Sequence, residues 1–363
     1  LVIDHLPDEP LMRALEAKRG RRGRDDYPIR ALWNALLAGI VFQHPSIESL
    51  RRELRRNIQL RAMCGFDLLA GLDAVPSAAA FSRFGQALAQ HDDAIQTMFD
   101  TLVDELSNHL DGFGRVLALD GKAIASHARP RKKDAPPPEA QAPDGRRDTD
   151  ANWGVKTYTR KGKDGSTDKK TVYWFGYKLH QIVDAAYELP VAFQLTKASA
   201  AEITQAHQLL PALAQAHGHL VDRCEVLTAD RGLDDGKFNR RLWEDYRIRP
   251  VIATREMWES PQPKVLPGHE RVLYDEQGQL HCWCPESGRR QPMAFAGFES
   301  DRGTLKFRCP AKHYGMTCPG QARCRIGSQV RVKLEVDRRL FTPVARCSHA
   351  WGKLYNKRTS VER

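Results

Sequence analysis

The sequence lacks any apolar run that approaches the roughly 20 residues needed to span a bilayer. It also opens without the charged and then apolar segment that is typical of a secretory signal. We therefore expect a cytoplasmic protein, and we find no internal repeat that would indicate a solenoid. Because the first residue is Leu1 and not Met, we expect the natural protein to extend further at this end.

Cysteine is scarce, with 8 residues in a chain of 363. That number is too small for a disulfide scaffold of this length. Three of the cysteines are scattered, and we assign no role to Cys64, Cys224 or Cys347. The other five lie close together in the sequence, at Cys282, Cys284, Cys309, Cys318 and Cys324.

Acidic residues are outnumbered by basic ones, 45 against 56, which leaves a net charge of +11. Such an excess favours a polyanionic partner. Nucleic acid is the leading candidate, ahead of an anionic membrane surface.

The length predicts two or three domains, because single hydrophobic cores stop growing near roughly 250 to 300 residues. In the first 110 residues the apolar side chains recur at helical spacing, and Ser46 and Ser77 are suited to cap helices. The helix after Pro28 should bury one apolar stripe, made by Ile29, Leu32, Trp33, Leu36, Leu37, Ile40 and Val41. We predict an all-helical domain over 1–110, used for DNA binding or dimerisation.

The pattern then changes to that of an α/β domain over 111–254. The runs RVLALDGKAI and CEVLTADRG read as buried strands that end in Asp120 and Asp230. Between them, TVYWFGYKLHQIVD and LPVAFQLTKA read as two paired strands. Proline and charge predict a mobile loop over 128–150. Glycine, proline and cysteine predict a small insertion over 255–340, before a helix over 341–363 that belongs to the α/β domain.

The two aspartates are the strongest sign of chemistry. Each alone is explained equally well as a turn residue that closes a strand. Two carboxylates about 4 Å apart repel each other by roughly 4 kcal/mol, so a cation should lie between them. Oxygen ligands suit Mg²⁺ or Mn²⁺, and a third acid would complete a site for phosphodiester chemistry. Glu362 is the candidate, although its spacing is also that of an exposed acid paired with Arg358.

Basic side chains form the candidate DNA contacts. The predicted helix after Ser46 carries a cationic face that either binds phosphates or is simply solvated, made by Arg51, Arg52, Arg55 and Arg56. Lys178 and His180 alternate with Leu179 and should face the predicted site. Arg358 is placed to hold a phosphate or to orient Glu362, and Tyr355 offers a hydroxyl to a DNA backbone.

The clustered cysteines are typical of a structural Zn²⁺ site. Cys284, Cys309, Cys318 and Cys324 supply four thiolates, three of them in Cys-Pro dipeptides. Their spacing is irregular, and Cys282, His281 or His313 are alternative ligands. The other interpretation is that these are free, reduced cysteines.

Tyr355, Arg358 and Glu362 together read Y-x2-R-x3-E. This resembles the signature of bacterial insertion-sequence DDE transposases, and the residues from Pro28 to Asn57 resemble the amino-terminal domain of InsH-like transposases. ALDGK and LTADRGLDD resemble the family's two catalytic strands. The signature continues with a basic residue beyond position 363, so the resemblance predicts that the chain is truncated at its carboxyl end, in addition to the amino-end truncation that Leu1 indicates.

The resemblance implies an RNase H-like mixed sheet flanked by helices, with Asp120, Asp230 and Glu362 as a DDE triad that binds Mg²⁺ or Mn²⁺. It implies cleavage at insertion-sequence ends and strand transfer, acting on terminal inverted repeats and target DNA as a homodimer associated with the nucleoid. Two alternatives stay open, which are an inactive DNA-binding remnant and an RNase H-like nuclease.

Overall fold

The computed structural model describes residues 2–17, 27–130, 148–161, 167–260, 262–284 and 286–362. Most of the predicted loop over 128–150 lies outside the described residues. The chain divides into two compact units, Leu1–His109 and Leu110–Arg363. Within the described ranges, no helix is both long and apolar enough to cross a membrane.

The first unit is helical, and its apolar stripes meet in one core that includes Leu32, Trp33 and Leu54. Ser46 and Ser77 cap two of the helices, accepting hydrogen bonds from Ser49 N and Ala80 N as their sequence contexts predict. The helices are α1 (Val2–His5), α2 (Glu9–Ala17), α3 (Ile29–Val41), α4 (Ile47–Arg56), α5 (Ile58–Cys64), the short 3-10 helix η1 (Gly71–Ala74), α6 (Ala78–Leu88) and α7 (Asp92–His109).

Two details of this unit differ from the expectation. The segment after Ser46 is two helices and not one, because Asn57 leaves the helical conformation and its side chain caps α5 by accepting from Leu60 N. The apolar stripe of α3 is buried over its first turns only. Ile40 and Val41 are 75% and 52% exposed, since they lie on the last turn beyond the core.

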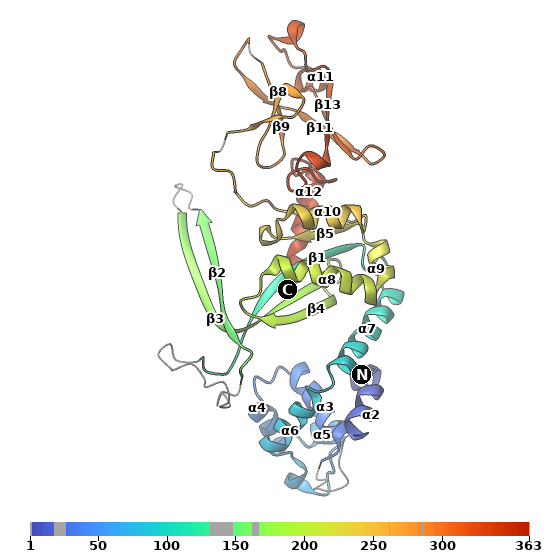
Figure 1. Ribbon diagram of the computed structural model, residues 1–363. Coiled ribbons are helices and arrows are strands. Elements are labelled where there is room, and N and C mark those ends of the chain that lie inside the picture. The colour runs from blue at the N-terminus through green and yellow to red at the C-terminus, as the bar shows by residue number, and fades with distance from the viewer. Residues whose placement is uncertain are drawn as a thin grey trace, which may run out of the picture. The chain divides into compact units, whose positions relative to one another are not determined.

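The second unit is organised by a six-stranded mixed sheet (Figure 1). Its order is β2-β3-β1-β5-β6, and β4 also pairs with β3. β3 runs antiparallel to β1, β2 and β4, whereas β1, β5 and β6 are mutually parallel. The strands are β1 (Val116–Ala125), β2 (Asn152–Lys161), β3 (Thr167–Asp184), β4 (Pro190–Lys197), β5 (Val226–Ala229) and β6 (Arg249–Ile252).

The order and directions of these strands are compatible with an RNase H-like sheet, as predicted. The paired strands β3 and β4 form where the sequence predicts them. β2 was missed, and it pairs with the first half of β3 as a two-stranded arm (Figure 1, green).

Helices cover the sheet. α8 contacts β1, β3 and β4, and α10 contacts β6. From α12, Trp351, Leu354 and Tyr355 pack against Val226 and Val251 of β5 and β6. These helices and the flanking short ones are α8 (Glu202–Ala216), α9 (Gly218–Arg223), η2 (Arg231–Leu233), α10 (Gly236–Glu244), α12 (His349–Asn356) and η5 (Lys357–Val361).

Between β6 and α12 the chain builds two further antiparallel sheets, in the orders β10-β9-β8-β7 and β11-β12-β13. Their apolar side chains share a core that contains Phe307 and Phe341. The elements are β7 (Lys264–Leu266), β8 (His269–Tyr274), β9 (Leu280–Trp283), β10 (Arg290–Pro292), β11 (Ala294–Glu299), β12 (Thr304–Arg308), α11 (Pro310–Tyr314), η3 (Gln321–Arg323), β13 (Gln329–Lys333) and η4 (Leu334–Val336).

Candidate active site

The register of the sheet brings Asp120 and Asp230 side by side. β1 and β5 are parallel, and their last aligned pair is Leu119 with Ala229. The next residue of the chain after each of these is an aspartate, on β1 for Asp120 and just after β5 for Asp230, so both carboxylates emerge at the same point of the sheet. β1 does not end at Asp120, as the sequence suggested, because its pairing with β3 continues to Ala125.

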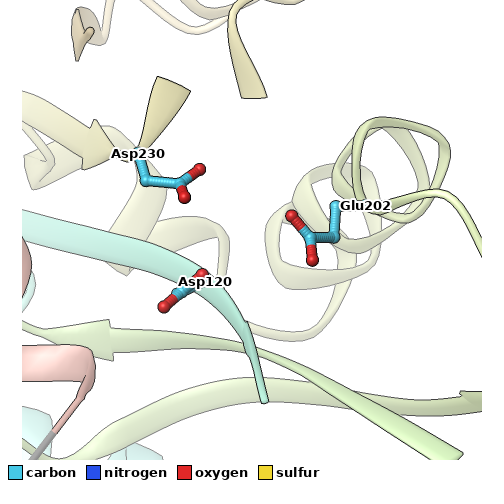
Figure 2. A group of neighbouring side chains, drawn as sticks. All are labelled: Asp120, Glu202 and Asp230. Atoms are coloured by element: carbon cyan, nitrogen blue, oxygen red, sulfur yellow. The ribbon is translucent and has the colours of Figure 1, made fainter. Parts of the chain in front are cut away.

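A third carboxylate joins the pair, and it belongs to Glu202, the first residue of α8. Ligand oxygens of Asp120, Glu202 and Asp230 all lie within 4.8 Å of one another. Figure 2 shows the three side chains around one space, with Asp230 and Glu202 pointing toward each other. Sequence analysis missed Glu202. An acid in the first turn of a helix is common because it complements the helix dipole, so position alone does not mark it as functional.

Backbone amides hold both aspartates. Asp120 Oδ1 accepts from Gly121 N at 2.8 Å, and Asp230 Oδ1 accepts from Gly232 N at 2.7 Å. Burial raises the pKa of Asp120, and the charges of Asp230 and Glu202 raise it further, against the Gly121 hydrogen bond and Lys156. The site therefore carries a concentration of negative charge that a cation would relieve.

The aspartate at β1 opens onto a cavity of about 340 Å³, which we call the acidic cleft. Lys178 Nζ lies 3.5 Å from Glu202 Oε1 and donates to Ala200 O. Burial lowers the pKa of Lys156, but Glu202, Asp120 and Asp230 outweigh burial and keep that pKa above its ordinary value. The cleft is lined by Asp120, Gly121, Lys122, Ala123, Val155, Lys156, Tyr158, Val172, Trp174, Lys178, Gln181, Glu202, Val361 and Glu362.

This donor set fits a divalent cation. Three carboxylates with oxygens within 4.8 Å of one another provide the hard oxygen ligands that Mg²⁺ and Mn²⁺ prefer. The transposase resemblance implies such an ion at Asp120 and Asp230, and the residues present agree with it.

Glu362 lies on the wall of the same cleft but outside the close group of three carboxylates. Its side chain is 50% exposed and pairs with Arg358 at 2.5 Å, the alternative that its spacing left open. The preceding residue is fixed more firmly. Val361 is buried against Ala118 and Val183, and Gln181 Nε2 donates to Val361 O. The short helix η5 therefore carries Glu362 to the cleft without placing its carboxylate between the aspartates.

Of the other residues of the signature, Tyr355 stacks on Trp351 with ring centroids 4.6 Å apart. The Arg358 guanidinium lies 5.6 Å from the centre of the Tyr355 ring. The Y-x2-R-x3-E spacing thus forms a local chain of contacts that runs from Tyr355 through Arg358 to Glu362.

The predicted DNA contacts fall in different environments. Lys178 lines the acidic cleft, whereas His180 is 2% exposed and its Nε2 pairs with Thr196 Oγ1. Burial, followed by the charge of Lys178, lowers the pKa of His180 to about 4. His180 is therefore a neutral residue inside the sheet layer, and its burial argues against the DNA contact predicted for it.

On α4, the Arg51 side chain is engaged in contacts within the protein, since it donates to Pro76 O and pairs with Glu48. Arg56 is exposed and pairs with Glu53 of the same helix. Arg52 and Arg55 are exposed as well. The exposed cationic face is thus made by Arg52, Arg55 and Arg56.

The five clustered cysteines line a second cavity, of about 100 Å³, which we call the cysteine cavity. Burial raises the pKa of Cys282 to about 11, and nearby Cys309, Cys318 and Cys324 contribute to that shift. Hydrogen bonds from Ser287 lower the pKa of the Cys284 thiol. Among the described residues, the close group of three carboxylates is the sole set of three or more metal-binding side chains within 4.8 Å of one another. Zinc binding stays a prediction.

A family model described as Transposase DDE domain matches residues 111–363, and one described as Transposase domain (DUF772) matches residues 1–87. A putative transposase for insertion sequence element IS402 from Burkholderia cepacia is 39% identical over 79 residues. That match covers 21% of this chain and 37% of the relative, so the chain spans a little over a third of the relative's length. No solved structure matches. The DDE-domain match extends over most of the chain, and the chain belongs to the DDE transposases of bacterial insertion sequences.

Proposed function

We propose that this protein cuts DNA at the ends of an insertion sequence and joins the freed ends to target DNA, with Asp120, Asp230 and Glu362 as its triad. One observation carries the proposal. Asp120 and Asp230 follow the last aligned pair of two adjacent parallel strands, in a chain whose residues 111–363 match the transposase DDE domain.

Asp120, Asp230 and Glu362 would hold the metal ions. Two Mg²⁺ or Mn²⁺ ions, when bound, would activate the attacking oxygen and stabilise the leaving oxygen of an in-line displacement. Arg358 holds Glu362 by their ion pair, and the bond from Gln181 to Val361 O anchors that segment to β3. Lys156 and Lys178 bring positive charge to the cleft, where they would contact the phosphates that flank the cut.

The reaction has two displacements at phosphorus. In the first, water attacks the phosphodiester at the transposon end, and the bond to the 3′ oxygen breaks. In the second, the freed 3′ hydroxyl attacks a target phosphodiester and displaces another 3′ oxygen. Both displacements need the same placement of oxygens around phosphorus, so one site can serve both.

The helical unit would bind the terminal inverted repeats. Its exposed arginines, Arg52, Arg55 and Arg56, are suited to phosphate contacts. Two ends must be brought together, so we propose a homodimer on DNA. Within the second unit, we assign residues 111–254 and 341–363 to the catalytic domain and 255–340 to an insertion in it.

The test uses supercoiled plasmid that carries the element's own terminal repeats, with Mg²⁺ and the purified chain. We expect cleaved ends and strand-joined products from the wild type. Asp120→Asn and Asp230→Asn should each lose both, and the matched control Asp222→Asn, an exposed acid on α9, should retain both.

The outcomes separate the alternatives. Cleavage without joined products would favour an RNase H-like nuclease. Binding of the repeats without any cleavage would favour an inactive DNA-binding remnant. Joining that survives both aspartate substitutions would overturn the mechanism.

A further inference from the structure

Glu202 is the one member of the close carboxylate group that the proposed triad does not use. It begins α8, and only 18% of its side chain is exposed. Glu362, the acid of the triad, is 50% exposed and engaged with Arg358. Of these two glutamates, Glu202 is therefore the more buried, and its carboxylate is the closer to Asp120 and Asp230.

Two glycines leave room for the Glu202 carboxylate, and each follows one of the aspartates. A Cβ atom at Gly121 would lie 3.2 Å from Glu202 Oε1 and 3.3 Å from its Cγ. A Cβ atom at Gly232 would lie 3.0 Å from Glu202 Oε2 and 2.8 Å from Asp230 Oδ1.

Backbone freedom does not account for these glycines, since neither has a positive φ. The need for space beside the carboxylate accounts for them. The glycine of DG after Asp120 and the glycine of DRG after Asp230 each leave room for the carboxylate of the same residue, Glu202. A helix-capping or surface role for Glu202 would not require space beside both aspartates.

The charges around Glu202 are arranged for a cation. Its nearest positive group, Lys178, is 3.5 Å away and also donates to Ala200 O. That separation is longer than a charge-assisted hydrogen bond of about 2.7–2.9 Å, so Lys178 does not bind the carboxylate tightly. The Glu202 carboxylate points toward Asp230, as Figure 2 shows, and one of its oxygens lies within 4.8 Å of ligand oxygens of Asp120 and Asp230.

We propose that Glu202 is a metal-holding residue of this site, and that it binds a divalent cation together with Asp120 and Asp230 in the DNA-free protein. The inference rests on the proposed function. Glu202, on α8, would be a fourth carboxylate of the site. Glu362 would then hold metal only after DNA has bound.

The test measures Mn²⁺ binding to the purified full chain without DNA, both by calorimetry and from the Mn²⁺ paramagnetic resonance signal. Glu202→Gln keeps the size of the side chain and removes its charge. We expect it to weaken binding by about 10- to 100-fold, the range seen even for outer-shell residues of metal sites. Glu362→Gln should change binding less than about threefold. The matched control is Glu270→Gln, an exposed acid on β8, and it should bind like the wild type.

A second substitution separates metal binding from a purely structural ion pair. Lys178→Met removes the same pair from its other side, and we expect it to bind Mn²⁺ as tightly as the wild type or more tightly, because it removes a competing positive charge. If Glu202 served only to pair with Lys178, neither substitution would change Mn²⁺ affinity, and both would lower the unfolding temperature in EDTA.

The inference is overturned if Glu202→Gln binds Mn²⁺ like the wild type while Asp120→Asn does not. If both aspartate substitutions also leave binding unchanged, the proposed function fails with it. Should Glu202→Gln fail to fold, Glu202→Asp takes its place. Weaker binding by Glu202→Asp supports the inference, and wild-type binding overturns it.

Discussion

The acidic cleft and the cysteine cavity are both predicted metal sites, but they differ in how closely the fold brings their candidate ligands together. At the acidic cleft, ligand oxygens of Asp120 and Glu202 on its wall and of the neighbouring Asp230 all lie within 4.8 Å of one another. In the cysteine cavity, five cysteines are among the lining residues, but among the described residues no three of their ligand atoms come that close. The protein alone brings the candidate ligands of the first site together, whereas the candidate ligands of the second site line one cavity without coming that close.

The difference follows from the elements that carry the ligands. Neighbouring strands lie about 4.7–4.9 Å apart, so acids at matching positions of parallel strands are close whether or not a metal is bound. Asp120 and Asp230 have this relation. Cys309, Cys318 and Cys324 lie at element ends and turns, where no strand ladder fixes their spacing. Such ligands usually gather only when the metal binds.

Apart from the two aspartates, the largest effect should come from Glu362, the acid that no strand holds. If activity depended only on the three carboxylates that already lie close together, Glu362→Gln would not affect it. We expect it to lower strand cleavage by more than about 100-fold, beyond the loss typical of residues outside the ligand shell. The unfolding temperature should barely change, because an exposed pair such as Arg358–Glu362 contributes only about 0–1 kcal/mol. Plasmid cleavage and thermal unfolding measure the two effects, and full activity would contradict the triad.

The next effect concerns the space beside the aspartates. Gly232→Ala adds a Cβ within 3.0 Å of the Asp230 and Glu202 oxygens, and we expect cleavage to fall by about 10- to 100-fold. Gly218→Ala is the control, since no atom lies within 4 Å of its new Cβ and its φ is ordinary. Equal activity of the two variants would show that the cleft tolerates displaced carboxylates.

A further prediction concerns the zinc content of the cysteine cavity. We expect about one zinc per chain and its loss in Cys282→Ser, because the Cys282 thiol lies near Cys309, Cys318 and Cys324. Cys347→Ser is the matched control and should keep its zinc, since Cys347 is not among the residues that line the cysteine cavity. Elemental analysis of both purified variants measures this. A wild type without zinc would leave the cysteine cavity a reduced, metal-free pocket.

The smallest effect is on stability. Burial, then the charges of Asp230 and Glu202, raise the folded-state pKa of Asp120 above its unfolded value. The ionised group therefore destabilises the fold at neutral pH, and the destabilisation disappears as pH falls through the folded-state pKa. In EDTA, Asp120→Asn should unfold at a higher temperature than the wild type at pH 7, and this gain should shrink toward acid pH. Asp222→Asn should show no such gain, and a gain that does not vary with pH would contradict the cause given.

Much of the fold is readable from local pattern. Helical periodicity and the serine caps predict α4 and α6, and apolar runs predict β1, β3, β4 and β5. β2 was missed because its polar and aromatic residues form a strand only by pairing with β3. The break at Asn57 was missed because a short polar residue between two amphipathic helices fits a continuous helix equally well.

The candidate site divides in the same way. The sequence by itself determined that Asp120 and Asp230 end apolar runs, that Tyr355, Arg358 and Glu362 share a local spacing, and that the cysteines cluster, since each of these is a relation between near neighbours in the chain. Only the tertiary structure decided that Glu202 joins the aspartates, that Glu362 stands beside them with Arg358, and that His180 is buried. These depend on strand register and on where α8 and η5 pack, which are contacts between distant segments that no local pattern encodes.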